Sequence, residues 1–247
     1  MEAGMGSLKE AAGNPNAKGR ILEVAAEMFS QKGFAATRVD KIALEAGVNK
    51  ALIYYYFPSK EAILDDLIES FFDRLSAAGM SFVEQSVLKF IQEGRMDIME
   101  GRLEFSSEGD LMAFLGDTKE YYEKIMDELL GQRQTLRIIM LESLSGGKHK
   151  SELFRYYKMS EGKLGNPLFM AISNADADFK YGDVVVFNKF FFSTMPLISF
   201  VVFCDDYAKI SGQDAAALKQ YYINSVFTMM APYIKGKSIL FQPDPIM

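Results

Sequence analysis

Apolar residues recur at helical spacing between residues 18 and 32, and this pattern predicts the first strong helix of the chain. Ile21, Ala25 and Phe29 follow one another at four-residue intervals, which places them on one face of a helix. Gly33 comes directly after this segment. It predicts the end of the helix, because glycine readily adopts the left-handed conformation found at helix C-termini.

Two short helices are predicted next. Thr37 and Asp40 stand in the S/T-x-x-D arrangement of a capping box, which predicts that Thr37 caps the second helix. The apolar residues of that helix are Val39, Ile42, Ala43 and Ala46. Gly47 predicts its end, and Asn49 is placed to cap a third helix that reaches about Tyr56.

A longer helix followed by two short ones and a tight glycine turn is the pattern of a helix-turn-helix. On the third helix, Ile53 and Phe57 are four residues apart and are expected to pack inward. Lys50, Ala51 and Tyr54 are then left facing outward. Lysine can bind guanine or phosphate, tyrosine can contact a phosphate or a thymine methyl, and alanine permits close approach, so this face suits the major groove of DNA.

The charge of the whole chain gives no hint of a nucleic-acid partner, but its distribution does. With 27 Lys and Arg residues against 33 Asp and Glu residues, the formal net charge is −6. Residues 16–60 contain seven cationic and four anionic residues, a net charge of +3, which leaves −9 for the rest. A locally cationic segment is the electrostatic footprint of DNA binding.

The segment 37–64, TRVDKIALEAGVNKALIYYYFPSKEAIL, resembles the DNA-binding domain of TetR-type transcriptional regulators. Those proteins carry an A-G-V-S-x-G-x-L-Y-x-Y-F-x-S-K-E pattern. The chain departs from it at Asn49, where serine is common, and at Ala51, where glycine is common. Both serine and asparagine cap helices, whereas the alanine changes how closely the third helix can approach the bases.

The resemblance implies the residues that contact DNA. They are Thr37, Arg38, Lys41, Asn49, Lys50, Ala51, Tyr54, Tyr55, Tyr56 and Lys60. The resemblance implies that Lys50, Ala51 and Tyr54 face the bases. It implies that the other side chains of the set lie at or near phosphates, apart from Asn49, which caps the third helix. One alternative is that Tyr55 and Tyr56 are packed between helices. The other is that Lys50 and Lys60 are ordinary solvated side chains.

From about residue 62 onward nearly every segment has a helical pattern, and no sustained alternation of apolar and polar residues predicts a strand. The expected helices are 59–77, 80–93, about 97–107, 109–115, 118–131, 133–145 and 150–159, then a long connection over 161–182 and two final helices at 183–207 and 213–234. Residues 1–15 are expected to form a disordered tail.

The last two predicted helices are apolar over much of their surface. The resemblance implies that they form a four-helix dimer interface, with Phe200, Leu218, Tyr222, Val226 and Met229 as its residues. Burial of both helices within a monomer is the alternative. Pro196 is expected to kink or locally open its helix. The apolar stretch around it is shorter than the roughly 20 residues that span a bilayer, which favours a buried helix over membrane contact.

The resemblance also implies an effector pocket among the middle helices. Methionine and aromatic side chains suit adaptable apolar pockets, and the predicted lining residues are Tyr122, Met126, Met140 and Phe191. The alternative is that these side chains belong to the ordinary core.

The composition argues against several kinds of chemistry. Cys204 is the one cysteine, so the chain forms no internal disulfide and offers no cysteine-rich zinc site. His149 is the one histidine and a poor candidate for a general base. The sequence therefore predicts no enzymatic activity, no metal and no cofactor, and a reducing cytoplasm as its location.

The sequence predicts an all-α homodimeric transcription factor, a repressor that leaves a palindromic DNA operator when a small, largely apolar effector binds. The expected division is a tail at 1–15, a helix-turn-helix domain at 16–61 and an effector-binding and dimerisation domain at 62–247. The alternative is a helical ligand-binding or interaction protein that has lost DNA binding, which the alanine at position 51 keeps open.

Overall fold

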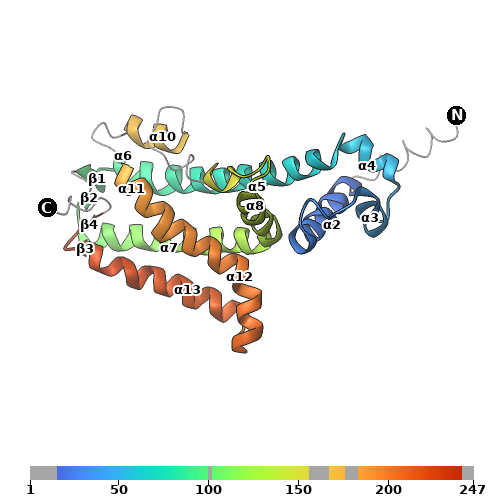
Figure 1. Cartoon of the computed structure of the whole chain (residues 1–247). Coiled ribbons are helices and arrows are strands. Elements are labelled where there is room, and N and C mark those ends of the chain that lie inside the picture. Colours follow the sequence, from blue (N-terminus) through green and yellow to red (C-terminus); the bar gives the residue numbers. More distant parts are fainter. Residues whose placement is uncertain (1–15, 100–101, 156–166, 176–182, 241–247) are drawn as a thin grey trace. The chain divides into compact units, whose positions relative to one another are not determined.

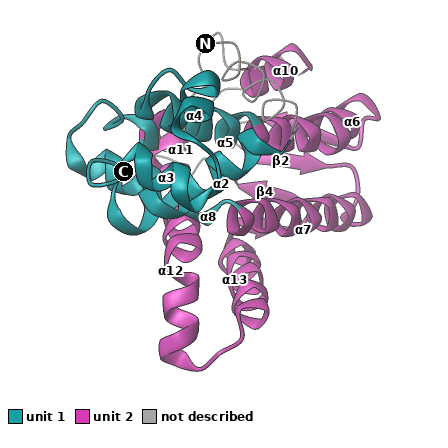
Figure 2. Cartoon of the chain, turned by 90° about the vertical axis from the view of Figure 1, so that its right-hand side faces the viewer, with its two compact units in different colours: residues 1–73, 132–153 teal, residues 74–131, 154–247 magenta. Residues whose placement is uncertain are grey.

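The computed structural model describes residues 16–99, 102–155, 167–175 and 183–240 (Figure 1). The predicted tail at 1–15 lies outside these residues, as does part of the predicted helix at 150–159. The chain divides into two units: unit 1 contains residues 1–73 and 132–153, and unit 2 contains residues 74–131 and 154–247 (Figure 2).

Unit 1 is built from helices that share one apolar core. They are α2 (Ala17–Lys32), α3 (Val39–Glu45), α4 (Lys50–Tyr56), the first part of α5 (Lys60–Phe82) and α8 (Arg133–Ser145). Helix α2 packs against α3, α4 and α8. The first four helices all contribute fully buried side chains, among them Ile21, Phe29, Ile42, Ile53 and Leu64. This confirms the predicted packing helix and the two short helices that follow it.

Unit 2 is a larger helical assembly. After the second part of α5 come the π-helical turn η1 (Val83–Leu88), α6 (Lys89–Gln92), α7 (Glu108–Gly131), α10 (Pro167–Ala175), α11 (Asp183–Asn188), the π-helical segment η2 (Lys189–Thr194), α12 (Met195–Ser211), α13 (Ala215–Met230) and the 3-10 turn η3 (Ala231–Tyr233). Helix α7 packs against both α12 and α13.

Several predicted boundaries in unit 2 are wrong. The segment 60–92 is continuously helical, whereas two helices were expected, and α7 joins the two helices expected at 109–115 and 118–131. The predicted connection over 161–182 contains α10. Gly79 and Gly116, which suggested the two breaks, are accommodated inside α5 and α7, because packing overrides local propensity.

A small antiparallel sheet is the main departure from the predicted helices. Strands β1 (Met96–Met99), β2 (Arg102–Phe105), β4 (Ser238–Leu240) and β3 (Ile234–Lys235) lie in that order (Figure 1). The helix expected at about 97–107 is therefore wrong, and the last predicted helix ends before residue 234. The sheet buries Met96, Phe105 and Ile239 with Phe90 and Phe114 in one apolar cluster.

Pro196 follows a π-helical segment, η2, and occupies the first turn of α12. Proline lacks an amide hydrogen, and a π-helical turn relieves the helix of the missing hydrogen bond. This confirms the expected local opening.

Residues Val186–Ser211 are long and apolar enough to cross a membrane by length and composition, a test that core helices of other proteins also pass. In this structure α12 packs against α7 and α13, and 33% of the apolar window is buried.

Candidate nucleic-acid interface

Helix α4 is held in place by a cap at its start and by apolar side chains on one face. The Asn49 side chain accepts a hydrogen bond from the Leu52 amide at 2.7 Å, which confirms the predicted cap. Gly47 has a φ of +63°, a left-handed conformation that suits glycine and lets the chain turn between α3 and α4. Leu52 and Ile53 are buried, so the opposite face of α4 points toward solvent.

The outward face of α4 carries the residues that the sequence places there. Lys50 and Ala51 are exposed, Tyr54 is 45% exposed and Tyr55 is 68% exposed. Tyr56 is half-buried, and its ring meets that of Tyr55 edge to face at 5.2 Å. The alternative of packing between helices therefore fails for Tyr55, and Tyr56 is only partly accessible.

An ion pair ties α4 to α3. The Lys50 ammonium lies 2.6 Å from the Asp40 carboxylate and 5.9 Å from the centre of the Tyr54 ring. Arg38 also approaches Asp40, at 3.7 Å. The hydrogen bond and charge of Lys50 hold the pKa of Asp40 below its usual value, and Asp40 in turn raises the pKa of Lys50.

The predicted capping role of Thr37 is wrong. Arg38 is the N-cap residue of α3, and no side chain caps this helix. Thr37 is buried, and its hydroxyl donates to the carbonyl oxygens of Gly33 at 2.9 Å and Met28 at 3.3 Å. The threonine therefore ties the turn after α2 to the end of that helix. Its expected phosphate contact stays a prediction, and this buried geometry does not favour it.

Lys60 is engaged within unit 1. Its ammonium donates to the carbonyl oxygens of Phe34 at 2.8 Å and Thr37 at 3.0 Å, and lies 4.3 Å from the centre of the Phe34 ring. These contacts join the first turn of α5 to the loop between α2 and α3. A DNA contact by this lysine stays a prediction. Arg38, with a side chain 78% exposed, and the exposed Lys41 are the accessible cations on and beside α3.

Two features of unit 1 were missed in the sequence. The sequence pattern places Asp40 in a capping box, whereas in the structure its carboxylate pairs with two cations of the predicted DNA surface, Arg38 and Lys50. His149 is buried, with its Nε2 3.5 Å from an oxygen of Asp65, and Lys148 also pairs with Asp65 at 3.0 Å. These partners lie far apart in the sequence or on different elements, so no local motif marks them.

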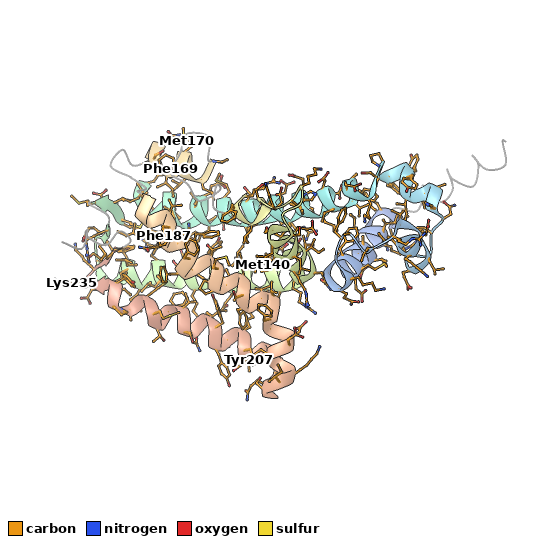
Figure 3. The ribbon with its side chains drawn as sticks, viewed as in Figure 1. Met140, Phe169, Met170, Phe187, Tyr207 and Lys235 are labelled. Carbon is orange, nitrogen blue, oxygen red and sulfur yellow. The ribbon has the colours of Figure 1, made fainter. Side chains whose placement is uncertain are left out.

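The four predicted effector residues do not gather in one unit. Met140 lies on α8 of unit 1 (Figure 3), and the other three belong to unit 2. Met126 is fully buried, Phe191 is 49% exposed, and the Tyr122 ring meets Phe227 of α13 at 6.0 Å. Met126 thus fits the alternative of an ordinary core residue.

The predicted dimer residues are mostly committed to contacts within their own chain. Phe200 stacks on Tyr222 with the ring centres 4.6 Å apart, and Leu218 is buried. Val226 is half-buried, whereas Met229 is 62% exposed. Other apolar side chains of α12 and α13 are exposed: Phe203, Tyr207, Ile210 and Tyr221. These four exposed residues were not predicted, because the helical spacing of apolar residues does not reveal which apolar face of a helix meets its neighbour.

No cluster of three or more histidine, cysteine or acidic side chains suited to a metal occurs among the described residues.

Comparison with known proteins points to a nucleic-acid partner. Residues 21–67 match the family model for bacterial regulatory proteins of the tetR family. These residues contain α3, α4 and most of α2, so the match covers the geometry described above. The N-terminal domain is therefore a TetR-type helix-turn-helix.

Individual relatives match over less than a third of the chain. The HTH-type transcriptional repressor KstR2 of Mycobacterium tuberculosis is 40% identical over 76 residues, which are 30% of this chain and 38% of the relative. The HTH-type transcriptional regulator RutR of Escherichia coli is 46% identical over 56 residues, 23% of this chain and 26% of the relative. These matches thus span less than half of the relatives' own length.

A likeness over the whole chain is weaker. A crystal structure of Thermus thermophilus FadR, a TetR family transcriptional repressor in complex with lauroyl-CoA, has a TM-score of 0.44 and 15% sequence identity. The match covers 93% of this chain and 100% of that one. At this score the likeness decides neither the fold of unit 2 nor its ligand.

Proposed function

We propose that the chain is a DNA-binding transcriptional regulator, acting as a repressor, and that the outward face of α4 reads its operator. The observation that carries this proposal is the capped α4 helix, whose buried face fixes its orientation and whose opposite face presents Lys50, Ala51 and Tyr54. A helix of this kind enters the major groove, where lysine and tyrosine can contact bases and phosphates.

We further propose that unit 2 joins two chains and binds a small, largely apolar effector. Phe203, Tyr207 and Ile210 of α12 support the first part, because they are exposed at the spacing of one helix face and contiguous exposed apolar surface marks interaction sites. The many aromatic and methionine side chains of unit 2 support the second part. An effector that relieves repression must bind better to the chain when it is off DNA, since only differential affinity shifts the equilibrium.

The proposed function is not enzymatic, and the proposed location of the chain is the cytoplasm. Its support is the match of residues 21–67 to the tetR family model, together with relatives that are named as a transcriptional repressor and a transcriptional regulator. Of the effector residues expected from the sequence, Tyr122 and Phe191 remain proposals for a pocket within unit 2.

A mobility-shift titration tests DNA binding directly. The probe is duplex DNA from the region upstream of the chain's own gene, titrated at several salt concentrations. We expect Lys50→Ala and Tyr54→Ala to weaken binding, each by about tenfold, which corresponds to one lost base or phosphate contact. The matched control is Lys119→Ala, which removes an exposed lysine of α7 in unit 2.

Two results would contradict the proposal. One is unchanged binding by both α4 variants, which would remove α4 as the recognition element. The other is the absence of salt-dependent binding to any duplex, which would favour a ligand-binding or interaction protein that has lost DNA binding.

A further inference from the structure

An acidic side chain lies among the cations of the predicted DNA surface. Asp40 belongs to the first turn of α3, and its side chain is 50% exposed. The Lys50 ammonium of α4 lies 2.6 Å from one of its oxygens, and the Arg38 guanidinium lies 3.7 Å from the other. One carboxylate thus faces two of the cations expected to meet DNA.

The pair has a defined geometry on the side of Lys50. The distance of 2.6 Å is that of a short, charge-assisted hydrogen bond. The same ammonium lies 5.9 Å from the centre of the Tyr54 ring, one helical turn further along α4. A lysine side chain has four rotatable bonds, so these two neighbours restrict where its ammonium points. They also keep it beside Tyr54, the other residue proposed to read bases.

We propose that Asp40 is a positioning residue that makes DNA binding selective. This inference rests on the proposed DNA-binding function. Asp40 acts in two ways. It orients the Lys50 ammonium, which has three donors and can keep the carboxylate while donating to a base. It also offsets the attraction of Lys50 and Arg38 for phosphates, an attraction that is the same for every DNA sequence.

These two effects separate operator DNA from other DNA. Binding to random sequence depends on phosphate attraction alone, so the carboxylate only weakens it. Binding to the operator also gains from a lysine that is already oriented, since less conformational freedom is lost on binding. Asp40 therefore lowers the affinity for random DNA and lowers the affinity for the operator by less.

The test compares two probes with the full chain. The first is a duplex selected from a random library by the wild-type chain, and the second is a scrambled duplex of equal length and composition. Asp40→Asn removes the charge at nearly constant volume. We expect it to tighten binding to the scrambled duplex about three- to tenfold and to steepen the salt dependence by about one unit of slope. Binding to the selected duplex should tighten less, so the ratio of the two affinities falls.

Two controls isolate the role of position. Glu45→Gln removes the same charge from an exposed residue at the other end of α3 and should change both probes by the same factor. Asp40→Glu keeps the carboxylate and should recover most of the selectivity. In a Lys50→Ala background, Asp40→Asn should no longer change the affinity ratio, because the residue that it positions is gone.

The outcomes are distinct. The proposal is overturned if the ratio of affinity for the selected duplex to affinity for the scrambled duplex stays constant or rises in Asp40→Asn. It is also overturned if Glu45→Gln lowers that ratio as much as Asp40→Asn does. A circular dichroism melt of each variant excludes simple unfolding as the cause. Failure of the wild-type chain to select any sequence would instead contradict the proposed function itself.

Discussion

Lys60 shows how one side chain can hold two parts of a small domain together. Its ammonium is shared by the carbonyl oxygens of Phe34 and Thr37, and a longer contact reaches Ala35 at 3.4 Å. Resemblance to a family motif suggests a DNA contact for this lysine, yet these carbonyls lie 23 to 26 residues away in the sequence. A contact over that separation cannot be inferred from the motif.

We expect Lys60→Met to destabilise unit 1 by about 1–3 kcal/mol, because partly buried carbonyl oxygens then lose their donor. Chemical denaturation measures this as a lower free energy of unfolding. The control is Lys32→Met, which removes an exposed lysine from the last turn of α2. Equal stability of the two variants would show that the Lys60 hydrogen bonds contribute little.

Tyr222 gives a prediction at alkaline pH. Burial of its phenol, followed by the neighbouring Tyr122, raises the pKa of Tyr222 to about 12. In the unfolded chain a tyrosine ionises near pH 10. The protonated phenol therefore stabilises the folded state fully below about pH 10, and this contribution is lost as the pH rises toward 12.

We expect Tyr222→Phe to remove this part of the pH dependence. The free energy of unfolding of wild type minus that of the variant should be constant up to about pH 10 and then fall toward pH 12. Urea titrations over that range measure it, with Tyr221→Phe, an exposed neighbour, as the control. A difference that stays constant to pH 12 would contradict the assigned burial.

At the scale of elements, the success of sequence reasoning depends on how local each signal is. The end of α2 at Gly33, the turn at Gly47 and the cap at Asn49 each depend on a few adjacent residues, and the structure confirms them. The pairing of β2 with β4 was missed because the two strands lie more than 130 residues apart in the chain. The alternation Met-Asp-Ile before Glu100 and Leu-Glu-Phe after Arg102 was the available signal.

The cap of α4 is a prediction at this scale. Asn49→Ala should destabilise unit 1 by about 1 kcal/mol, because the Leu52 amide loses its acceptor. Asn49→Ser, which restores a capping residue, should be close to wild type. Thermal melts give both values. Equal loss in the two variants would indicate that the asparagine acts through something other than its cap.

At the scale of the whole molecule, the proposal is that unit 1 binds DNA and that unit 2 joins two chains and binds an effector. The residues predicted for the dimer are largely packed within the chain, whereas Phe203, Tyr207 and Ile210 of α12 are 56%, 58% and 86% exposed. Tyr207 is marked in Figure 3. The apolar composition of α12 was readable in the sequence, but which of its faces meets α7 and α13 was not.

We expect the wild-type chain to be a dimer and Tyr207→Asp to shift it toward monomer. Two carboxylates brought together in a symmetric interface repel each other and lose water. Sedimentation velocity at micromolar concentration measures the change. Met112→Asp, which places the same charge at an exposed residue of α7, is the control. A monomeric wild-type chain contradicts the proposed dimer.

Selection from a random DNA library tests the central claim most directly, since it requires both a reading helix and a pair of chains. We predict that the wild-type chain enriches an inverted repeat whose half-sites are centred about one helical turn, or a multiple of it, apart. We also predict that Lys50→Ala combined with Tyr54→Ala abolishes the enrichment. No enriched sequence with the wild-type chain, or the same sequence with the double variant, would contradict the account.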